Sequence, residues 1–257
     1  MAHGCRTGSI HQPVSRTLVI GDIHGGLKAL LQVLERVQVR SNDKLIFLGD
    51  YVDGWSESPQ VVEYVMALAE QQTCILIKGN HDECCEDWLR TSHADKSWLF
   101  HGGQATAKSY EPISNIVRKK HLRFFESLQL YYIDPYNRLF IHAGFTSNEG
   151  PQVELASPGF SWDRTLWETA LALDKNIKPS SARFPQRLTL FPEIYIGHTP
   201  TLFYNETVPM NSANVWNVDT GAAFTGRLTV MDVDTKVFWQ SDPVRELYPG
   251  EAGRNRN

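Results

Sequence analysis

Five short polar clusters hold the residues of this sequence that could do chemistry together. Each combines glycine with aspartate, asparagine or histidine, and each directly follows a short apolar run. The clusters are Gly21-Asp22-Ile23-His24-Gly25, Gly49-Asp50-Tyr51-Val52-Asp53-Gly54, Lys78-Gly79-Asn80-His81-Asp82, His142-Ala143-Gly144 and Gly197-His198-Thr199-Pro200. A single cluster means little, since Asp-Gly and Gly-Asn pairs are common in turns. Five of them, each at the end of an apolar run, are hard to explain as ordinary loops.

The residue types in the clusters match the ligands of a pair of divalent cations. Carboxylates, amides and imidazoles gathered in a closed core would repel one another or lack hydrogen-bond partners. Two cations with one bridging aspartate resolve this conflict. Oxygen and imidazole ligands without thiolates favour Mn, Fe, Zn or Co, and we expect manganese to serve in vitro. Two such ions ~3.5–4 Å apart can hold a bridging hydroxide and bind a phosphoryl group during in-line displacement.

The apolar runs before the clusters are typical of buried strands. Runs at residues 17–20, 45–48 and 74–77 alternate with helical patterns at 27–37 and 59–68, which predicts parallel strands in an α/β fold. Later strands are expected at residues 139–141, 194–196, 215–218, 228–233 and 237–239, and a helix at 166–173. Ligands of open α/β sheets bind beyond the carboxyl ends of the strands. We therefore expect the five clusters to converge.

The 257 residues suit a single domain spanning residues 1–257, because 42% of them are apolar and 21% charged. We expect loose termini at residues 1–16 and 244–257. Residues 83–127 are predicted to be mostly helical. This insert directly follows His81, so it could cap the site and select substrates.

Composition and spacing argue against several other classes of protein. The net charge is −4, and neither a basic stripe nor zinc-knuckle spacing indicates a nucleic-acid module. No apolar run is long enough to span a membrane. The four cysteines, Cys5, Cys74, Cys84 and Cys85, are too few and too unevenly spaced for a disulfide framework in a chain of this length. They predict reduced thiols in a cytoplasmic protein.

Taken together, the five clusters resemble the calcineurin-like metallophosphoesterase superfamily. They look most like its phosphoprotein phosphatase branch and bacterial diadenosine tetraphosphatase relatives, and the resemblance covers residues 17–219. It implies a four-layer αββα sandwich of two mixed β-sheets flanked by helices. It also implies a phosphoester hydrolase with two metal ions, in which a hydroxide bridging the metals attacks phosphorus and no covalent phosphoenzyme forms.

The resemblance also assigns roles to individual residues. The metal ligands it implies are Asp22, His24 and Asp50 for the first ion, and Asp50, Asn80, His142 and His198 for the second, with Asp50 bridging. His81 matches the general acid that protonates the leaving oxygen, and Asp53 matches its carboxylate partner. We expect this pairing to favour the imidazolium and to raise the pKa of His81.

Two positions depart from the family pattern. Pro200 stands where many members have a second histidine, and in this the chain is similar to the phosphoprotein phosphatase branch. Gly54 stands where that branch carries a phosphate-binding arginine, which glycine cannot replace. Trp162-Asp163-Arg164 resembles a Trp-x-Arg element of the bacterial members. Arg164 is therefore a candidate substrate-binding residue, although a surface arginine is an equally good interpretation.

Three functions fit this pattern. We favour a serine/threonine-type protein phosphatase acting on a phosphorylated protein. The alternative is a hydrolase of dinucleoside polyphosphates, such as diadenosine tetraphosphate, or of another small phosphoester. A non-catalytic scaffold with the same fold is the least favoured, because a scaffold should have lost ligands and this sequence keeps all six together with the His81–Asp53 pair.

Overall fold

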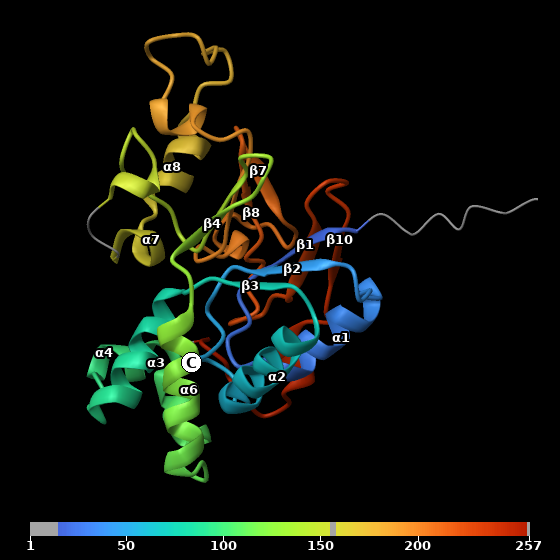
Figure 1. Ribbon diagram of the computed structural model, residues 1–257, viewed down its shortest axis with the longest axis vertical. Coiled ribbons are helices and arrows are strands. Elements are labelled where there is room, and N and C mark those ends of the chain that lie inside the picture. Colours follow the sequence, from blue (N-terminus) through green and yellow to red (C-terminus); the bar gives the residue numbers. More distant parts are fainter. Residues whose placement is uncertain (1–14, 155–157, 256–257) are drawn as a thin grey trace, which may run out of the picture.

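The computed structural model describes residues 15–154 and 158–255, and these contain two mixed five-stranded sheets (Figure 1). The first sheet has the order β10 (Phe238–Gln240), β9 (Thr229–Asp232), β1 (Thr17–Ile20), β2 (Lys44–Phe47) and β3 (Cys74–Leu76). The second has the order β4 (Tyr131–Ile133), β5 (Leu139–Ile141), β6 (Ile194–Ile196), β8 (Val215–Asn217) and β7 (Met210–Ser212). Strands β1, β2 and β3 are parallel, and so are β5, β6 and β8. The expected parallel βαβαβ unit is confirmed.

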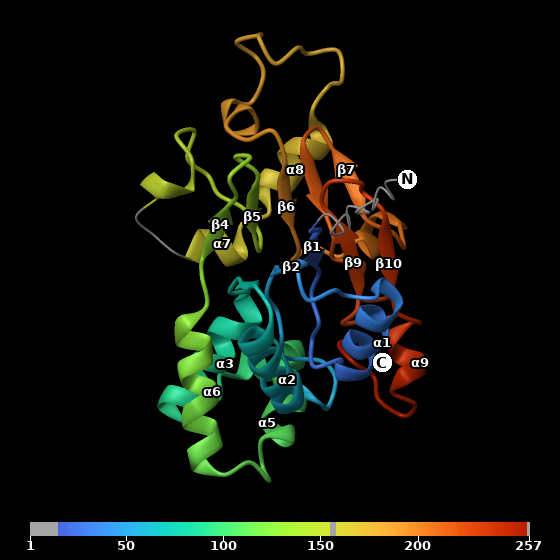
Figure 2. The same ribbon diagram turned by 45° about the vertical axis from the view of Figure 1, so that its right-hand side comes forward.

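Helices cover the outer faces of both sheets. They are α1 (Leu27–Val37), α2 (Ser58–Gln71), α3 (Asn80–Thr91), α4 (Lys96–Trp98), α5 (Gln104–Ser109), α6 (Asn115–Ser127), α7 (Pro158–Trp162), α8 (Thr165–Ala172) and α9 (Val244–Leu247), with a π-helical turn at Leu99–Gly103. Helix α1 packs on β9 and β10, and α8 packs on β7 and β8. Figure 2 shows α1 and α2 in the lower half of the molecule, below β1 and β2, whereas α7 lies beside β4 and β5 and α8 near β6 and β7 in the upper half. Within the described ranges, no helix is long and apolar enough to cross a bilayer.

The alternation of side chains along the strands creates the four layers. Leu18 and Ile20 of β1 pack toward α1 and α2, whereas Val19 points the other way. Val19 joins Phe140 of β5 and Tyr195 of β6 in a core between the two sheets. The remaining side chains of β5 and β6 pack against α7 and α8. The αββα sandwich predicted from the resemblance is confirmed.

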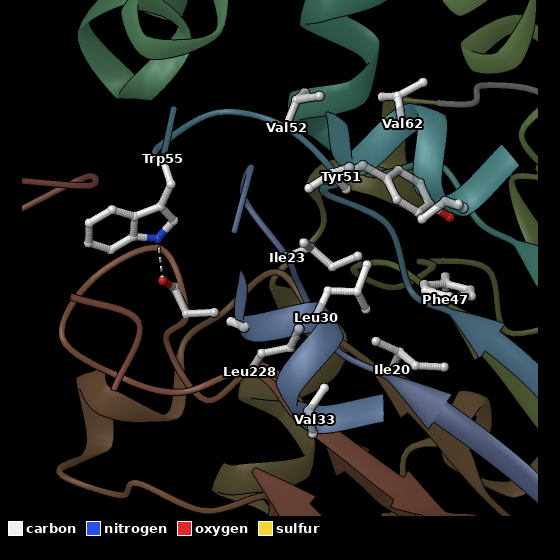
Figure 3. Packing of buried hydrophobic residues seen from close by; sticks show 14 of the residues in the cluster. Ile20, Ile23, Leu30, Val33, Phe47, Tyr51, Val52, Trp55, Val62 and Leu228 are labelled. Carbon is white, nitrogen blue, oxygen red and sulfur yellow. Dashed lines mark hydrogen bonds between the residues drawn. The ribbon is translucent and has the colours of Figure 1, made fainter. Parts of the chain in front are cut away.

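The core between the first sheet and helices α1 and α2 also holds the second polar cluster in place. In Figure 3, Tyr51, Val52 and Trp55 lie among the side chains that come from β1, β2 and α1. Nε1 of the fully buried Trp55 donates a hydrogen bond to the Ala222 carbonyl at 2.8 Å, drawn as a dashed line. The loop after β2 is therefore anchored on both sides of Asp53.

Candidate active site

The structure brings the five polar clusters together beyond the carboxyl ends of β1, β2, β3, β5 and β6. The turns there are sharp enough to strain the backbone. His24, Asp50, Asp53 and His198 all have positive φ angles, between 52° and 73°. Residues other than glycine rarely adopt this conformation, and when they do they cluster at functional sites. The strained turns at the strand ends therefore set the direction in which these four side chains point.

The predicted ligand atoms lie close to one another. Ligand atoms of Asp22, Asp50 and His142 all fall within 4.8 Å of one another. Oδ2 of Asp50 lies 3.5 Å from Nε2 of His24 and 3.5 Å from Nε2 of His142. Oδ1 of Asn80 lies 2.9 Å from Nδ1 of His198. Asp50 therefore stands between the two groups of ligands, as the bridging assignment requires.

Hydrogen bonds to the backbone fix the tautomers of two histidines. Nδ1 of His24 donates to the carbonyls of Val52 and Asp53 at 3.1 and 2.9 Å. Nδ1 of His142 donates to the Leu48 carbonyl at 2.8 Å. Burial lowers the pKa of both imidazoles, that of His142 to about 4. Both rings are therefore neutral and turn an Nε2 lone pair toward Asp50, an arrangement typical of metal-binding histidines.

A pair of divalent cations fits this set of residues. Nε2 of His142, with no proton to donate, lies 3.1 Å from Oδ1 of Asn80 and 3.5 Å from Oδ2 of Asp50, so only electron-pair donors face one another there. Oδ1 of Asp22 and Nε2 of His198 are buried and have no hydrogen-bond partner in the described part of the chain. Burial and the neighbouring carboxylates raise the pKa of Asp22 and Asp50 well above the ordinary value. Cations would relieve the repulsion and accept these lone pairs.

Two glycines leave room for the carboxylates. A Cβ atom at Gly79 would lie 2.1 Å from Oδ1 of Asp50, and one at Gly197 would lie 2.1 Å from Oδ1 of Asp22. Only glycine fits at positions 79 and 197, because the carboxylates of Asp50 and Asp22 lie so close to the backbone there.

His81 and Asp53 form the expected pair. Nδ1 of His81 lies 2.7 Å from Oδ2 of Asp53, and the same oxygen accepts a hydrogen bond from Nε1 of Trp98 at 2.6 Å. Burial raises the pKa of Asp53 to about 7. The expectation that the pKa of His81 is raised is wrong. Burial, followed by the positive charge of Arg254, lowers it, because an imidazolium there would be desolvated next to another cation.

The site lies in a hollow of about 460 Å³ whose walls include two arginines. Arg164, the predicted substrate-binding residue, stands exposed between α7 and α8, and the adjacent Trp162 donates a hydrogen bond to Glu83 of α3 at 3.0 Å. Arg254, which sequence reasoning did not single out, lines the same hollow. Its position near the end of the sequence, among glycines and polar residues, gave no signal.

Sequence reasoning also gave no role to Asp82. Its fully buried carboxylate accepts hydrogen bonds from the backbone N–H groups of Gly79, Asp50 and Tyr51 at 2.8, 2.8 and 2.9 Å. It therefore ties the turn that carries Asn80 to the turn that carries Asp50. The aspartate following Asn-His was visible as part of the motif, but its function as a clamp was not.

The family model for calcineurin-like phosphoesterases matches residues 15–207 of the chain. The chain belongs to this family of phosphoesterases. It is similar to the asymmetrical bis(5'-nucleosyl)-tetraphosphatase PrpE of Oceanobacillus iheyensis, with 25% identity over 86% of this chain and 89% of that protein. The PrpE protein of Bacillus anthracis is 27% identical over 83% of this chain and 88% of its own length.

The fold is shared with solved phosphatases of much lower sequence identity. A protein serine/threonine phosphatase from Saccharomyces cerevisiae, with similarity to human PP5, superimposes with a TM-score of 0.56. It is 16% identical, and the match covers 91% of this chain and 81% of that one. This likeness shows the shared fold, whereas the family model confirms the family membership and the phosphoesterase activity expected from the sequence.

Proposed function

We propose that this phosphoesterase hydrolyses dinucleoside polyphosphates such as diadenosine tetraphosphate. One observation carries the proposal. The hollow that contains the buried aspartates and histidines is also lined by two arginines and two tryptophans, which are Arg164, Arg254, Trp98 and Trp162. Guanidinium groups bind phosphates through paired charged hydrogen bonds. Exposed aromatic rings can stack on a base, and the Trp162 side chain is 50% exposed.

A second hollow, of about 630 Å³, has Arg254 in its wall, as the first does. Its wall includes Lys108 and Gln104 of α5. A substrate with several phosphates and two bases is longer than a phosphorylated side chain, so it can use both spaces. The names of the two PrpE relatives support the same substrate class.

The roles we propose for the residues follow from their geometry. Asp22, His24 and Asp50 would hold one divalent cation, and Asp50, Asn80, His142 and His198 the other. Bound cations supply Lewis-acid polarisation of the phosphoryl oxygens and lower the pKa of water, and we propose manganese for assays. His81, paired at Nδ1 with Asp53, would protonate the leaving oxygen from Nε2. Burial raises the pKa of Asp53 to about 7, so the proton between the two groups can lie on Asp53 and hydrogen-bond to Nδ1, which leaves the neutral ring with its proton on Nε2. Arg164 orients the phosphate.

A serine/threonine-type protein phosphatase is the second candidate. The observation that favours it is the single histidine of Gly197-His198-Thr199-Pro200, since the resemblance to the phosphoprotein phosphatase branch rests partly on Pro200.

The free thiols of Cys74, Cys84 and Cys85 support a reducing compartment, and we propose the cytoplasm.

The test compares two substrates at equal concentration with added Mn²⁺. Diadenosine tetraphosphate and a phosphothreonine peptide are incubated with the wild-type chain, and Asp50→Asn serves as the blank. Faster turnover of the nucleotide, with its products separated by ion-exchange chromatography, supports the proposal. Faster release of phosphate from the peptide would overturn it in favour of the second candidate.

A further inference from the structure

The expectation of a loose terminus at residues 244–257 is wrong for the described residues up to 255, because they form α9 and a segment after it that returns to the active site and is fixed there. The Tyr248 ring stacks on the Trp55 ring, with centroids 5.3 Å apart. The Glu251 carboxylate accepts hydrogen bonds from the backbone N–H and the hydroxyl of Ser56, at 3.1 and 2.7 Å. These contacts attach the segment directly beside the loop that contains Asp53 and Gly54.

Next along the chain, the backbone brings Arg254 to the site. Its N–H donates to the Ala223 carbonyl at 2.8 Å. A Cβ atom at the preceding Gly253 would lie 2.7 Å from that carbonyl oxygen and 2.7 Å from Cζ2 of Trp55. The backbone therefore passes so close to buried groups that only glycine fits before Arg254.

The aliphatic part of the Arg254 side chain lies in a slot between two glycines. A Cβ atom at Gly102 would lie 3.0 Å from Cγ of Arg254, and one at Gly54 would lie 3.4 Å from it. Both glycines have φ angles that L-residues rarely adopt, +115° and +128°. A side chain at position 54 would therefore start in contact with the Arg254 stem.

The charged end of Arg254 has no anionic partner. Among residues 15–154 and 158–255, no ion pair or hydrogen bond involves its guanidinium group, which lies 5.3 Å from the centre of the Phe224 ring. Arg254 lines the hollow together with Asp50, His81 and His198. A guanidinium group that makes no direct ion pair with the described residues, and that lines the hollow of the reacting centre, is suited to bind an anion.

We propose that Arg254 binds the substrate phosphate, in place of the arginine that the phosphoprotein phosphatase branch carries at the position of Gly54. The inference rests on the proposed function only in that the anion is a phosphoryl group of the substrate. Arg164 binds the phosphate from the α7–α8 side of the hollow, and Arg254 from the side of Gly54. Arg254, 200 residues further along the sequence, thus supplies the guanidinium group that position 54 lacks.

The first test uses inorganic phosphate as the probe and the metal-loaded chain. Phosphate binding is measured by titration calorimetry for the wild type, Arg254→Met, Arg254→Lys and Arg245→Ala. Methionine keeps an unbranched stem between the two glycines and removes the charge together with the N–H donors of the guanidinium group. Arg245→Ala removes an exposed arginine of α9 that lines neither hollow, so it is the matched control.

We expect Arg254→Met to weaken phosphate binding by about 10- to 100-fold, since hydrogen bonds between charged groups contribute this much. Arg254→Lys should recover part of the affinity, because it keeps the charge but not the paired donors. Arg245→Ala should bind phosphate like the wild type. Wild-type affinity in Arg254→Met overturns the inference, and so does a wild type that binds no phosphate.

Kinetics and melting separate a binding role from a structural one. With the better substrate, Arg254→Met should raise KM by about the same factor as it weakens phosphate binding, while the melting temperature changes by less than about 2 °C. A large fall in melting temperature shared by Arg254→Met and Arg254→Lys would overturn the inference in favour of a structural role. If the wild type hydrolyses neither substrate, the proposed function fails, yet phosphate binding still decides the role of Arg254.

Discussion

Replacing Asp82 by asparagine tests whether two ligand-bearing turns are clamped by one carboxylate. Oδ2 accepts from the backbone N–H groups of Asp50 and Gly79, both at 2.8 Å, and Oδ1 accepts from that of Tyr51 at 2.9 Å. An asparagine oxygen in the Oδ2 position can keep the first two bonds. Its NH₂ group then faces the N–H of Tyr51, so a donor meets a donor in a place without access to water.

The cost follows from the loss of one bond and of the charge. Leaving one buried N–H unsatisfied costs ~1–3 kcal/mol, and the two remaining bonds lose their charged acceptor. Against this, asparagine removes a negative charge that lies near Asp50, and burial together with Asp50 raises the pKa of Asp82. We expect a net loss of about 2–4 kcal/mol in the free energy of unfolding.

Urea unfolding followed by tryptophan fluorescence measures this loss. Asp87→Asn makes the same chemical change on an exposed residue of the same helix and should alter stability by less than about 0.5 kcal/mol. Metal affinity should also fall in Asp82→Asn, because the turns that carry Asp50 and Asn80 are no longer tied together. Stability and metal affinity equal to those of Asp87→Asn would refute the clamp.

Three further predictions concern single residues. Asp50→Asn should remove most of the activity while circular dichroism shows a folded chain, and full activity would refute its place between the metals. His81→Ala should lower turnover much more for an alkyl phosphate than for p-nitrophenyl phosphate, and equal losses would argue against a general acid. Burial opposes ionisation of Asp43, but hydrogen bonds from Arg16 and Arg40 outweigh it and lower the pKa of this carboxyl. The stabilisation by the ionised carboxylate is therefore present above pH ~4 and is lost as the pH falls through the folded-state pKa. Asp43→Asn should therefore destabilise the fold by about 1–3 kcal/mol at pH 7 and much less at pH 3, as thermal melts at both pH values will show.

The sequence was informative where local pattern and burial agree. Strands β1, β5 and β6 begin and end at the predicted residues, because each is a short, mainly apolar run with a charged residue before it and a glycine or histidine after it. Strands β4 and β7 were not predicted. Both lie at an edge of the second sheet and are only partly buried. Edge strands face water on one side, so their residues lack a continuous apolar signal.

The candidate site could be predicted to the extent that its residues occur in motifs. His81 and five of the six ligands are next to a glycine or another ligand, the sixth, His142, is two residues before Gly144, and strand ends bring them together. The effect of burial on ionisation was not predictable from the same motifs. The Asp53 carboxylate next to His81 suggested an imidazolium, but enclosure of the ring lowers its pKa instead. Pairing can be read from sequence, whereas desolvation depends on what packs over the pair.

Gly54 and Arg254 show why a departure from a motif needs the whole fold to explain it. From the sequence alone, glycine after Asp53 removes a phosphate ligand and casts doubt on phosphatase chemistry. In the structure, residue 54 has φ +128°, and a Cβ there would also lie 3.3 Å from the His24 carbonyl oxygen. An arginine at this position would be strained and would compete with Arg254 for the same slot. The two residues, 200 positions apart, are therefore best understood as alternatives: either position 54 carries a side chain, or the segment after α9 places a guanidinium group there.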